Sequence, residues 1–308
     1  MPKPREVRRR IKSVQSTRQI TKTMEMVATS KLKRAQDRVV AARPYAAALA
    51  GVIGDLYSPE LAERFALLRQ PGTGDIRKVG LILITSNRGL CGAFNANLMR
   101  EGRRRIRELE GQGAAVDLHL VGRKGIVFFK FLRRPIASQR TDIGDKPTAA
   151  HAVELVGPLM AQFETGGLDA VELVFAKFNS PVSTPPTTLR ILPVEPPAVG
   201  RKGGRAVSEP GRPTAVPPYR HTAYYILKPS AEAILDKLLP LYVRNQVYRA
   251  LVETAAAEHG ARRTAMKNAT DNAGEMLDIL RRTYNRARQA QITQEIAEIV
   301  GGAEALKG

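Results

Sequence analysis

The sequence predicts two long terminal helices that pair as an antiparallel coiled coil, with an α/β domain between them. The first observation is a helical periodicity that runs through the last eighty residues. The second is a heptad pattern that runs through the first helix from Thr21 to Leu56. The third is an alternation of short apolar runs and amphipathic segments between residues 75 and 195, as in a sheet with helices on both faces.

Residues 1–57 are predicted to form the first coiled-coil helix. Its apolar or small residues recur every three or four positions: Val7, Ile11, Val14, Thr21, Met24, Ala28, Leu32, Ala35, Val39, Ala42, Ala46, Leu49, Ile53 and Leu56. Alanine is frequent among them, so two helix backbones can approach closely and wind around each other. Because the pattern resumes beyond Pro44, we expect this proline to kink the helix rather than end it.

Residues 75–195 are predicted to form a Rossmann-like α/β domain. Four short apolar runs predict strands: 77–86, 116–122, 169–178 and 187–194. Three amphipathic or apolar segments predict helices: 95–110, 125–132 and 147–164. The alternation favours a mainly parallel sheet, and the proline-rich connection between the last two strands favours an antiparallel pair at one end of it.

Residues 196–223 are rich in proline, glycine and scattered charge, which predicts a flexible linker. The second coiled-coil helix is predicted at 229–301, with Ser230 as its N-cap, a kink at Pro240, and Gly301 and Gly302 as its stop. Its expected buried stripe is Ile234, Leu238, Leu241, Tyr248, Val252, Ala255, Met266, Ala269, Ala273, Met276, Leu280, Tyr284 and Ala287. Neither helix is stable alone, since helices gain most of their stability from packing an apolar face.

The net charge of +20 predicts an acidic partner: nucleic acid, an anionic membrane or an acidic protein. The first 43 residues contain 13 Lys and Arg against 3 Asp and Glu. These cations are mixed with seam positions along the whole rod, and no nucleic-acid-binding module is recognisable, so the pattern disfavours nucleic acid.

The composition is that of a soluble globular protein, and no stretch is expected to cross a membrane. The apolar run from Ala46 to Gly54 is too short to span a bilayer. The basic start has no apolar segment behind it, so it does not resemble a secretory signal. The one cysteine, Cys91, cannot form an internal disulfide and suits a reducing compartment.

The loop from Thr85 to Asn95 lies where a predicted strand gives way to a helix, a place where doubly wound folds bind ligands. It lacks both the dinucleotide-binding glycine spacing and the Walker pattern. Cys91 has no histidine base near it in the sequence, and the four histidines show no metal-ligand spacing, so a buried structural thiol is favoured. We therefore expect no catalytic residue, no metal site and no cofactor.

Three stretches resemble the signatures of one known family: 14–36, 84–98 and 265–306. They are similar to the gamma subunit of F-type ATP synthases of the bacterial type. The resemblance implies the central rotor shaft of a proton-translocating ATP synthase, itself non-catalytic. The paired helices would stand in a ring of three alpha and three beta subunits, which hold the nucleotide chemistry. The α/β domain would lie at the foot, beside the epsilon subunit and on the ring of c subunits, which proton flow turns.

The resemblance also implies subunit-contact residues. Arg288 and Gln289 match a pair that binds a catch loop on beta, and Thr293 and Glu295 match further polar contacts there. Met24 matches a methionine near the lever of beta. Two foot residues match the region that contacts the c ring, Tyr225 and Lys228. Lys228 stands where a glutamate is common, which reverses a charge beside the ring, and Asn87 stands where an aspartate is common.

The resemblance places the chain on the cytoplasmic side of the cell (inner) membrane as a peripheral protein, touching the membrane only through the c ring. It implies no nucleic-acid partner. The alternative hypothesis from the residues is a basic coiled-coil protein that binds nucleic acid or acts as a scaffold, and it would predict DNA association that falls steeply with salt.

Overall fold

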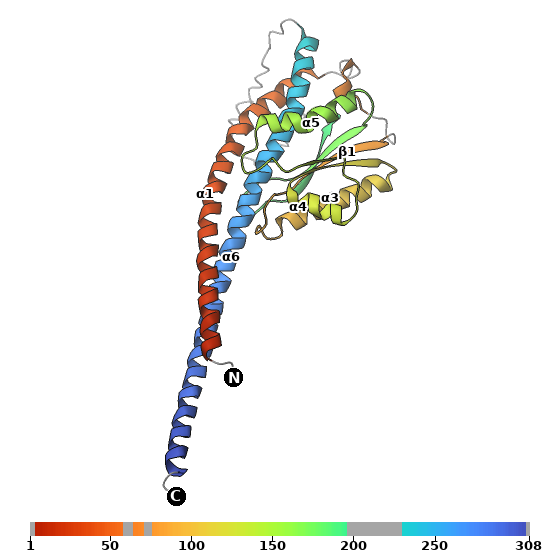
Figure 1. The fold of residues 1–308 in the computed structure, drawn as a ribbon. Helices are drawn as coiled ribbons and strands as arrows, with labels where there is room; N and C mark the ends of the chain where they lie inside the picture. The colour runs from red at the N-terminus through yellow and green to blue at the C-terminus, as the bar shows by residue number, and fades with distance from the viewer. Residues whose placement is uncertain (1–3, 58–63, 71–75, 196–229, 306–308) are drawn as a thin grey trace, which may run out of the picture.

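The computed structural model describes residues 4–57, 64–70, 76–195 and 230–305. The two longest elements are helix α1 (Pro4–Leu56) and helix α6 (Ala231–Ala305). They lie antiparallel along each other, and the α/β domain is attached to one side of the pair (Figure 1). Because α6 is the longer helix, its C-terminal part projects beyond the start of α1 as a single helix. The predicted coiled coil with an α/β domain between its helices is confirmed.

The seam of α1 follows the predicted heptad. Its buried residues are Val7, Thr21, Ala28, Leu32, Ala35, Val39, Ala46, Leu49 and Ile53. One pair in the seam is polar: the hydroxyl of Thr270 donates a hydrogen bond to that of Thr21 at 2.8 Å. The helix continues through Pro44 to Leu56, as predicted, because a chain that keeps its apolar stripe on both sides of a proline still gains from packing.

The seam of α6 differs from the predicted stripe. Val252, Ala255, Met266, Ala273 and Ala287 are buried as predicted. Ala269, Leu280 and Tyr284, which were also predicted to be buried, are half-buried. Near the start of the helix four others predicted to be buried are not: Ile234, Leu238 and Tyr248 are half-buried, and Leu241 is 41% exposed. The buried residues of this part of α6 are instead Leu235, Leu239, Val243 and Val247.

A second departure lies further along the same helix. Met276 is 52% exposed, whereas its neighbour Leu277 is 2% exposed. The first departure arises because α6 packs there against α1 on one side and against helix α5 (Ala149–Glu164) and the sheet on another. Every residue from 250 to 257 is consequently buried. A helix with apolar residues on two faces leaves the position of a single stripe ambiguous.

This corrected register gives a testable pair of substitutions. We expect Leu277→Ala to lower the free energy of unfolding by about 2–4 kcal/mol, because it empties a buried site between two helices. Met276→Ala should change it by about 0.5 kcal/mol or less, because that side chain is exposed. Urea unfolding of both variants of the isolated chain measures the difference. If Met276→Ala lowered the free energy of unfolding more than Leu277→Ala, the buried stripe predicted from the sequence would be the correct one.

The predictions for the two ends of α6 had different outcomes. At the start, the hydroxyl oxygen of Ser230 accepts a hydrogen bond from the backbone N–H of Ala233 at 3.2 Å, so the predicted N-cap is confirmed. At the other end, the prediction that Gly301 and Gly302 stop the helix was wrong, because the helix runs on to Ala305. A Cβ at either glycine would meet nothing within 4 Å, so no tertiary contact forces a turn there.

The α/β domain is built on a sheet of five strands. They are β1 (Lys78–Ile84), β2 (Ala115–Val121), β3 (Ser138–Arg140), β4 (Ala170–Ala176) and β5 (Pro186–Leu192). Their spatial order is β3-β2-β1-β4-β5, with the first four parallel and β5 antiparallel to β4, as predicted for the closing pair. Strand β3 was not predicted, because its three residues, Ser, Gln and Arg, form no apolar run.

Two layers of helices cover the sheet (Figure 1). Helices α3 (Phe94–Gly111) and α4 (Arg123–Phe131) lie on one face, and α5 and α6 lie on the other. The core on the second face is continuous with the helix pair, since Leu49 and Ile53 of α1 belong to the same cluster as Ile82 of β1 and Leu159 of α5. A short 3₁₀ helix, η1 (Ala66–Leu68), adds Leu67 and Leu68 to it.

Helix α1 contains one stretch of 18 residues that is long and apolar enough, by length and composition, to cross a membrane. The apolar side chains at this end of the helix already have protein partners. Leu49 and Ile53 are 6% and 1% exposed and lie in the core shared with the sheet. Of the 18-residue stretch as a whole, 22% is buried inside the protein.

Candidate functional site

The free end of α6 is a single helix without tertiary partners in the described part of the chain. All residues from 288 to 303 are exposed, including the predicted contact residues Arg288, Gln289, Thr293 and Glu295. Four apolar side chains are exposed there too: Ile292, Ile296, Ile299 and Val300, at 45%, 56%, 71% and 58%. Isolated helices of this length are marginal in water, so this end has the character of a surface that another protein covers.

The four predicted contact residues occupy adjacent rows of this helix end. Arg288 and Glu295 are seven residues apart, and Gln289 and Thr293 are four apart, so each pair shares a face. The hydroxyl of Thr293 donates to the backbone oxygen of Gln289 at 3.0 Å, and Glu295 accepts from the side-chain amide of Gln291 at 2.8 Å. Among the described residues, the guanidinium of Arg288 and the amide of Gln289 form no side-chain hydrogen bond. Both remain available to a partner.

Met24 lies elsewhere on the rod. Its side chain is half-buried in the α1 seam, close to Thr21, which bonds Thr270 of α6. Arg288 lies about 27 Å further along α6 than Thr270, at about 1.5 Å per residue. The fold therefore places Met24 and the Arg288 group at two separate levels of the rod. The predicted foot residues, Tyr225 and Lys228, lie outside the described residues.

The loop from Thr85 to Asn95 ties the carboxyl ends of β1 and β2 together. The hydroxyl of Thr85 donates to the backbone oxygen of Val121 at 2.9 Å and accepts from the backbone N–H of Gly125 at 3.0 Å. Gly122 lies so close that a Cβ would stand 2.1 Å from the Thr85 carbonyl oxygen, and its φ of 96° is one that side-chain-bearing residues rarely adopt. The loop's polar groups thus hold the strand ends in place.

Asn87 has a role that the sequence did not reveal. Its amide nitrogen donates to the backbone oxygens of Thr141 and Ile143, at 2.9 and 3.0 Å, and its amide oxygen accepts from the N–H of Arg123 at 2.9 Å. One side chain therefore joins β1 to the start of α4 and to the segment after β3. A carboxylate could not donate the first two bonds, so the asparagine suits this site by its chemistry.

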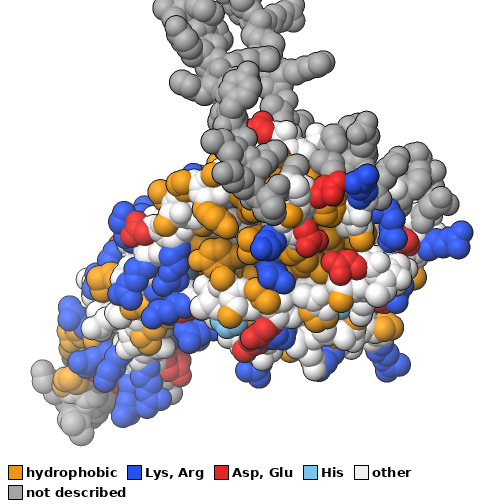
Figure 2. Space-filling view, turned by 90° about the horizontal axis from the view of Figure 1, so that it is seen from above, with side chains coloured by type: hydrophobic (Ala, Val, Ile, Leu, Met, Phe, Trp, Pro, Cys, Tyr) orange, Lys and Arg blue, Asp and Glu red, His pale blue; other side chains and the backbone are white. Residues whose placement is uncertain are grey.

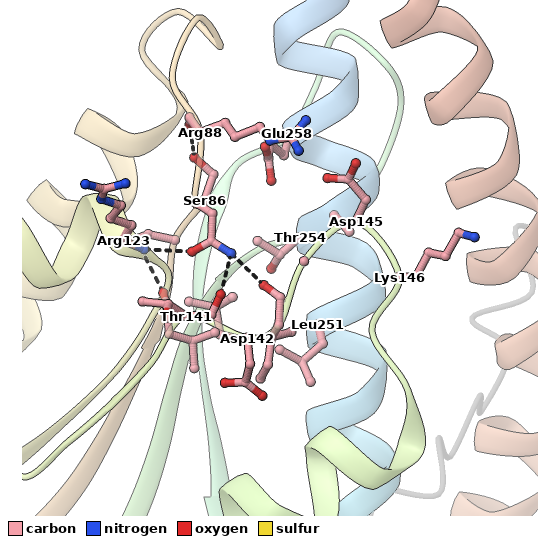
Figure 3. Close-up of a pocket in the computed structure, with 17 residues that line it drawn as sticks. Ser86, Arg88, Arg123, Thr141, Asp142, Asp145, Lys146, Leu251, Thr254 and Glu258 are labelled. Atoms are coloured by element: carbon pink, nitrogen blue, oxygen red, sulfur yellow. Dashed lines mark hydrogen bonds between the residues drawn. The ribbon is translucent and has the colours of Figure 1, made fainter.

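A cleft of about 870 Å³ lies at this edge of the sheet (Figure 3). Thr141 lines it from the segment after β3, and Arg123 lines it from the start of α4. Thr254 and Glu258 line it from α6, and Arg88 reaches toward Glu258. The carboxylate of Glu258 forms an ion pair with Arg262, one helical turn further on. Burial raises the pKa of the Glu258 carboxyl. The cleft thus mixes both signs of charge. The side-chain amide of Asn87 and the backbone N–H of Arg123, which lie at its wall, are engaged with protein oxygens.

A second polar cluster joins the α/β domain to both long helices at Asp145. Its carboxylate pairs with Lys31 of α1 and lies 3.8 Å from the imidazole of His259 on α6, while its backbone oxygen accepts from Arg38. Burial disfavours the imidazolium and lowers the pKa of His259 to about 4, so His259 is neutral near pH 7. The cluster fixes α1, α6 and the segment before α5 relative to one another.

Cys91 is buried at 2% exposure, as predicted, and accepts a hydrogen bond from the side-chain amide of Asn95 at 3.2 Å. Burial raises the pKa of its thiol, which disfavours the thiolate that a nucleophile needs. Among the described residues, no group of three or more His, Cys, Asp or Glu could hold a metal ion. These features define a class: an elongated protein with a long helix pair, an α/β domain at its side and an exposed helix end.

The comparisons with known proteins identify the family. The family model for ATP synthase matches residues 3–306. The ATP synthase gamma chain of Gemmatimonas aurantiaca is 59% identical over 308 residues, covering 100% of both chains. That of Moorella thermoacetica is 47% identical over 305 residues, covering 98% of this chain and 99% of its own. The chain belongs to the family of ATP synthase gamma chains.

Solved structures agree on the fold. A chain from the Euglena gracilis mitochondrial ATP synthase, solved as OSCP/F1/c-ring, has a TM-score of 0.62 at 20% identity, and the match covers 98% of this chain and 94% of that one. A chain from the Tetrahymena thermophila mitochondrial ATP synthase central stalk/c-ring has a TM-score of 0.59 at 24% identity, with 81% and 99% covered. The long helix pair with a lateral α/β domain is therefore shared with central-stalk chains.

Proposed function

We propose that the chain is the central rotor shaft of an F-type ATP synthase, which couples rotation of the c-subunit ring to the conformational cycle of catalytic beta subunits. The observation that carries the proposal is the 59% identity to an ATP synthase gamma chain over the full length of both chains. The chain itself is non-catalytic. It is a subunit of a membrane-associated complex.

The shape of the molecule supports this function. A stiff helix pair can transmit torque along its length, and an exposed end can contact different partners in turn as it rotates. Lys and Arg side chains gather along the helix pair, as seen from the end where α1 stops and α6 starts (Figure 2). A basic surface suits contact with acidic loops, and electrostatic complementarity gives attraction without a close-fitting interface.

Each predicted contact residue has a place in this proposal. Arg288 and Gln289 bind a loop of one beta subunit at a time, and Thr293 and Glu295 add polar contacts one turn and two turns further on. Met24 acts at the second level of the rod, near the lever of beta. Tyr225 and Lys228 contact the c ring at the foot. The four residues at the end of α6 are exposed, which supports their assignment as contacts with a beta subunit.

The partners and the cellular place follow from the same proposal. Residues 1–57 and 229–301 stand within three alpha and three beta subunits, with residues 75–195 beside the epsilon subunit and 196–223 as a linker. The c ring carries protons and is the chain's contact with the membrane. The complex faces the cytoplasm on the cell (inner) membrane, where the chain is peripheral.

The test of this function is purification followed by observation of rotation. The tagged chain, expressed with the other subunits, should bring alpha and beta subunits with it in stoichiometric amounts. With beta subunits fixed to a surface and a bead on an exposed residue of the α/β domain, ATP should drive rotation in one direction. A chain that purifies alone and binds DNA with a steep salt dependence would instead support the nucleic-acid alternative.

The loop chemistry gives a further prediction. We expect Cys91→Ala to leave ATP turnover of the assembled complex within a few-fold of the unsubstituted complex, because the thiol is buried and poorly ionised. The isolated chain should bind neither ATP nor a dinucleotide, as equilibrium dialysis would measure. Micromolar ATP binding by the isolated chain would contradict the inference that the loop is purely structural. Loss of turnover in a Cys91→Ala complex that still assembles would contradict it too.

A further inference from the structure

The strand order β3-β2-β1-β4-β5 places a topological switch point between β1 and β4. In doubly wound sheets, ligands bind in the crevice outside the carboxyl ends of the strands at this point. In this protein helix α6 lies there, bonded to the end of β4. Every residue of α6 from 250 to 257 is buried, and Leu251 and Thr254 line the cleft of about 870 Å³ that remains beside it (Figure 3). The rod itself therefore occupies the place of a ligand.

Two backbone donors at the carboxyl end of β4 bind side chains of α6. The N–H of Ala176 donates to the hydroxyl of Thr254 at 3.4 Å, and the N–H of Phe178 donates to the carboxylate of Glu253 at 3.2 Å. Both acceptors are buried, since Thr254 is 3% and Glu253 is 6% exposed. Arg249, one helical turn earlier, pairs with the same carboxylate at 3.3 Å. Because buried N–H groups need acceptors, the rod completes the hydrogen bonding of the strand end.

Two turns further on, the backbone of α6 lies against the segment that follows β4. A Cβ at Gly260 would stand 3.0 Å from the carbonyl oxygen of Pro181 and 3.4 Å from its Cα. The absence of a side chain at Gly260 is what lets the two backbones come so close. Glu253 and Gly260 are seven residues apart and share one face of the helix. This face of α6 is therefore held by β4 and the segment after it over two turns.

Other contacts hold the remaining sides of the same segment of α6. At about 100° per residue, Thr254 lies about 100° around the helix from Glu253, and His259 lies about 120° from Glu253 in the opposite direction. Asp145, from the segment before α5, lies 3.8 Å from the imidazole of His259 and pairs with Lys31 of α1. Residues 253–260 thus have polar contacts on three sides, so α6 cannot turn about its own axis here without breaking some of them.

We propose that residues 253–260 of α6 form the joint through which torque passes between the α/β domain and the helix pair, with Glu253 and Thr254 as its positioning residues. The apolar core between the sheet and the helices resists separation, but apolar contacts have no preferred direction and permit sliding. Hydrogen bonds weaken steeply when their angle changes, so they resist turning of the helix. The proposal rests on the proposed function, because torque acts on the chain only in a rotating complex.

The experiment measures how stiffly the α/β domain is attached to the rod. Alpha and beta subunits of the assembled complex are fixed to a surface, rotation is stalled with a non-hydrolysable ATP analogue, and a bead is attached through Arg107→Cys, an exposed position of α3. Glu253→Leu with Thr254→Val removes both acceptors and should increase the variance of the bead angle about twofold or more. Glu253→Gln with Thr254→Ser keeps an acceptor oxygen at both positions and should leave the variance unchanged. An unchanged variance in the first variant, or an equal increase in both, would overturn the proposal.

The matched control for lost stability is Leu109→Ala. Leu109 is 1% exposed in a small cluster with Val79, Ala114 and Ala170, which contains no residue of α6. This variant should lower the midpoint of thermal unfolding without changing the variance of the bead angle. An increase in variance as large as that of the double variant would mean that general loosening of the domain explains the effect, and the joint would be rejected.

A single substitution keeps the test decisive if the double variant fails to assemble. Thr254→Val removes one hydroxyl and changes the shape of the side chain little, so the complex should assemble. The variance of the bead angle should then rise by about half, because one of the two acceptors is lost. A variance equal to that of the unsubstituted complex would overturn the proposal.

Two further readouts separate the joint from the proposed function. In the isolated chain, Glu253→Leu with Thr254→Val should speed amide hydrogen exchange at Ala176 and Phe178, and unchanged exchange would refute the contacts themselves. Co-purification of alpha and beta subunits reports on the rotor assignment. A complex that retains both subunits and loses amide protection without a change in variance rejects only the joint, whereas a chain that brings neither subunit rejects both proposals.

Discussion

Replacing Arg288 or Gln289 with alanine should lower steady-state ATP turnover of the assembled complex by an order of magnitude or more. Both side chains are exposed on the free end of α6 and form no side-chain hydrogen bond among the described residues. A guanidinium beside an amide can bind carboxylate and hydroxyl groups of a partner loop, with charge-assisted hydrogen bonds contributing roughly 1.5–3 kcal/mol each. Losing one such bond at each step of a rotary cycle accounts for a tenfold effect.

The same substitutions should hardly change the folding of the chain itself. Exposed positions away from packing shift the free energy of unfolding by about 0.5 kcal/mol or less. Turnover and thermal unfolding are therefore measured on the same variants, with Arg286→Ala as the matched control. Arg286 is also exposed on α6, but it projects from a different side of the helix, about 200° around from Arg288. The prediction would be wrong if turnover stayed normal, or if failed assembly of the complex explained its loss. Arg288 and Gln289 would then be solvent-exposed residues without a binding role.

Replacing Gly122 with alanine should destabilise the α/β domain by about 3 kcal/mol or more. The residue has a φ of 96°, and the new Cβ would lie 2.1 Å from the carbonyl oxygen of Thr85, with no flexible side chain able to yield. The contact also lies where Gly122 donates its N–H to Arg140 and where Thr85 bonds Val121. Relief of the clash would therefore disturb β1, β2 and β3 together.

The control for this substitution is Gly111→Ala at the end of α3. A Cβ there meets nothing within 4 Å, and alanine favours helices over glycine by about 1 kcal/mol, so this variant should be as stable as the unsubstituted chain or more stable. Denaturant unfolding of the two isolated variants gives the comparison. Equal midpoints for Gly122→Ala and Gly111→Ala would mean that the strand ends can move apart at little cost.

The two terminal helices and the order of most strands and helices could be predicted from residue patterns alone. The heptad of α1 survives in the structure because one face of that helix packs along α6 for most of its length. Strands β1 and β4 were recognisable because both of their faces are covered by helices, which requires continuous apolar runs. Ser230 was recognisable as an N-cap because capping depends on one side chain and the adjacent backbone.

Some candidate site residues were identified only through the family resemblance, and other important residues were missed. The four at the end of α6 came from the resemblance alone, because an exposed polar helix face has no pattern that separates a binding surface from a solvated one. Asn87 and Asp145 were missed as structural links because their partners, such as Thr141, Lys31 and His259, are distant in sequence. The hydrogen bonds that Glu253 and Thr254 accept from the end of β4 could be recognised only once the fold was known.

The sequence by itself determined the helix pair, the alternating strands and helices and the family, because periodicity, capping and signature stretches are local properties of the chain. Only the tertiary structure decided which face of α6 is buried, because α6 packs against α1 and the sheet at once and several apolar stripes compete. It also decided that the polar run Ser138–Arg140 is an edge strand, because pairing with β2 depends on backbone hydrogen bonds rather than on apolar side chains.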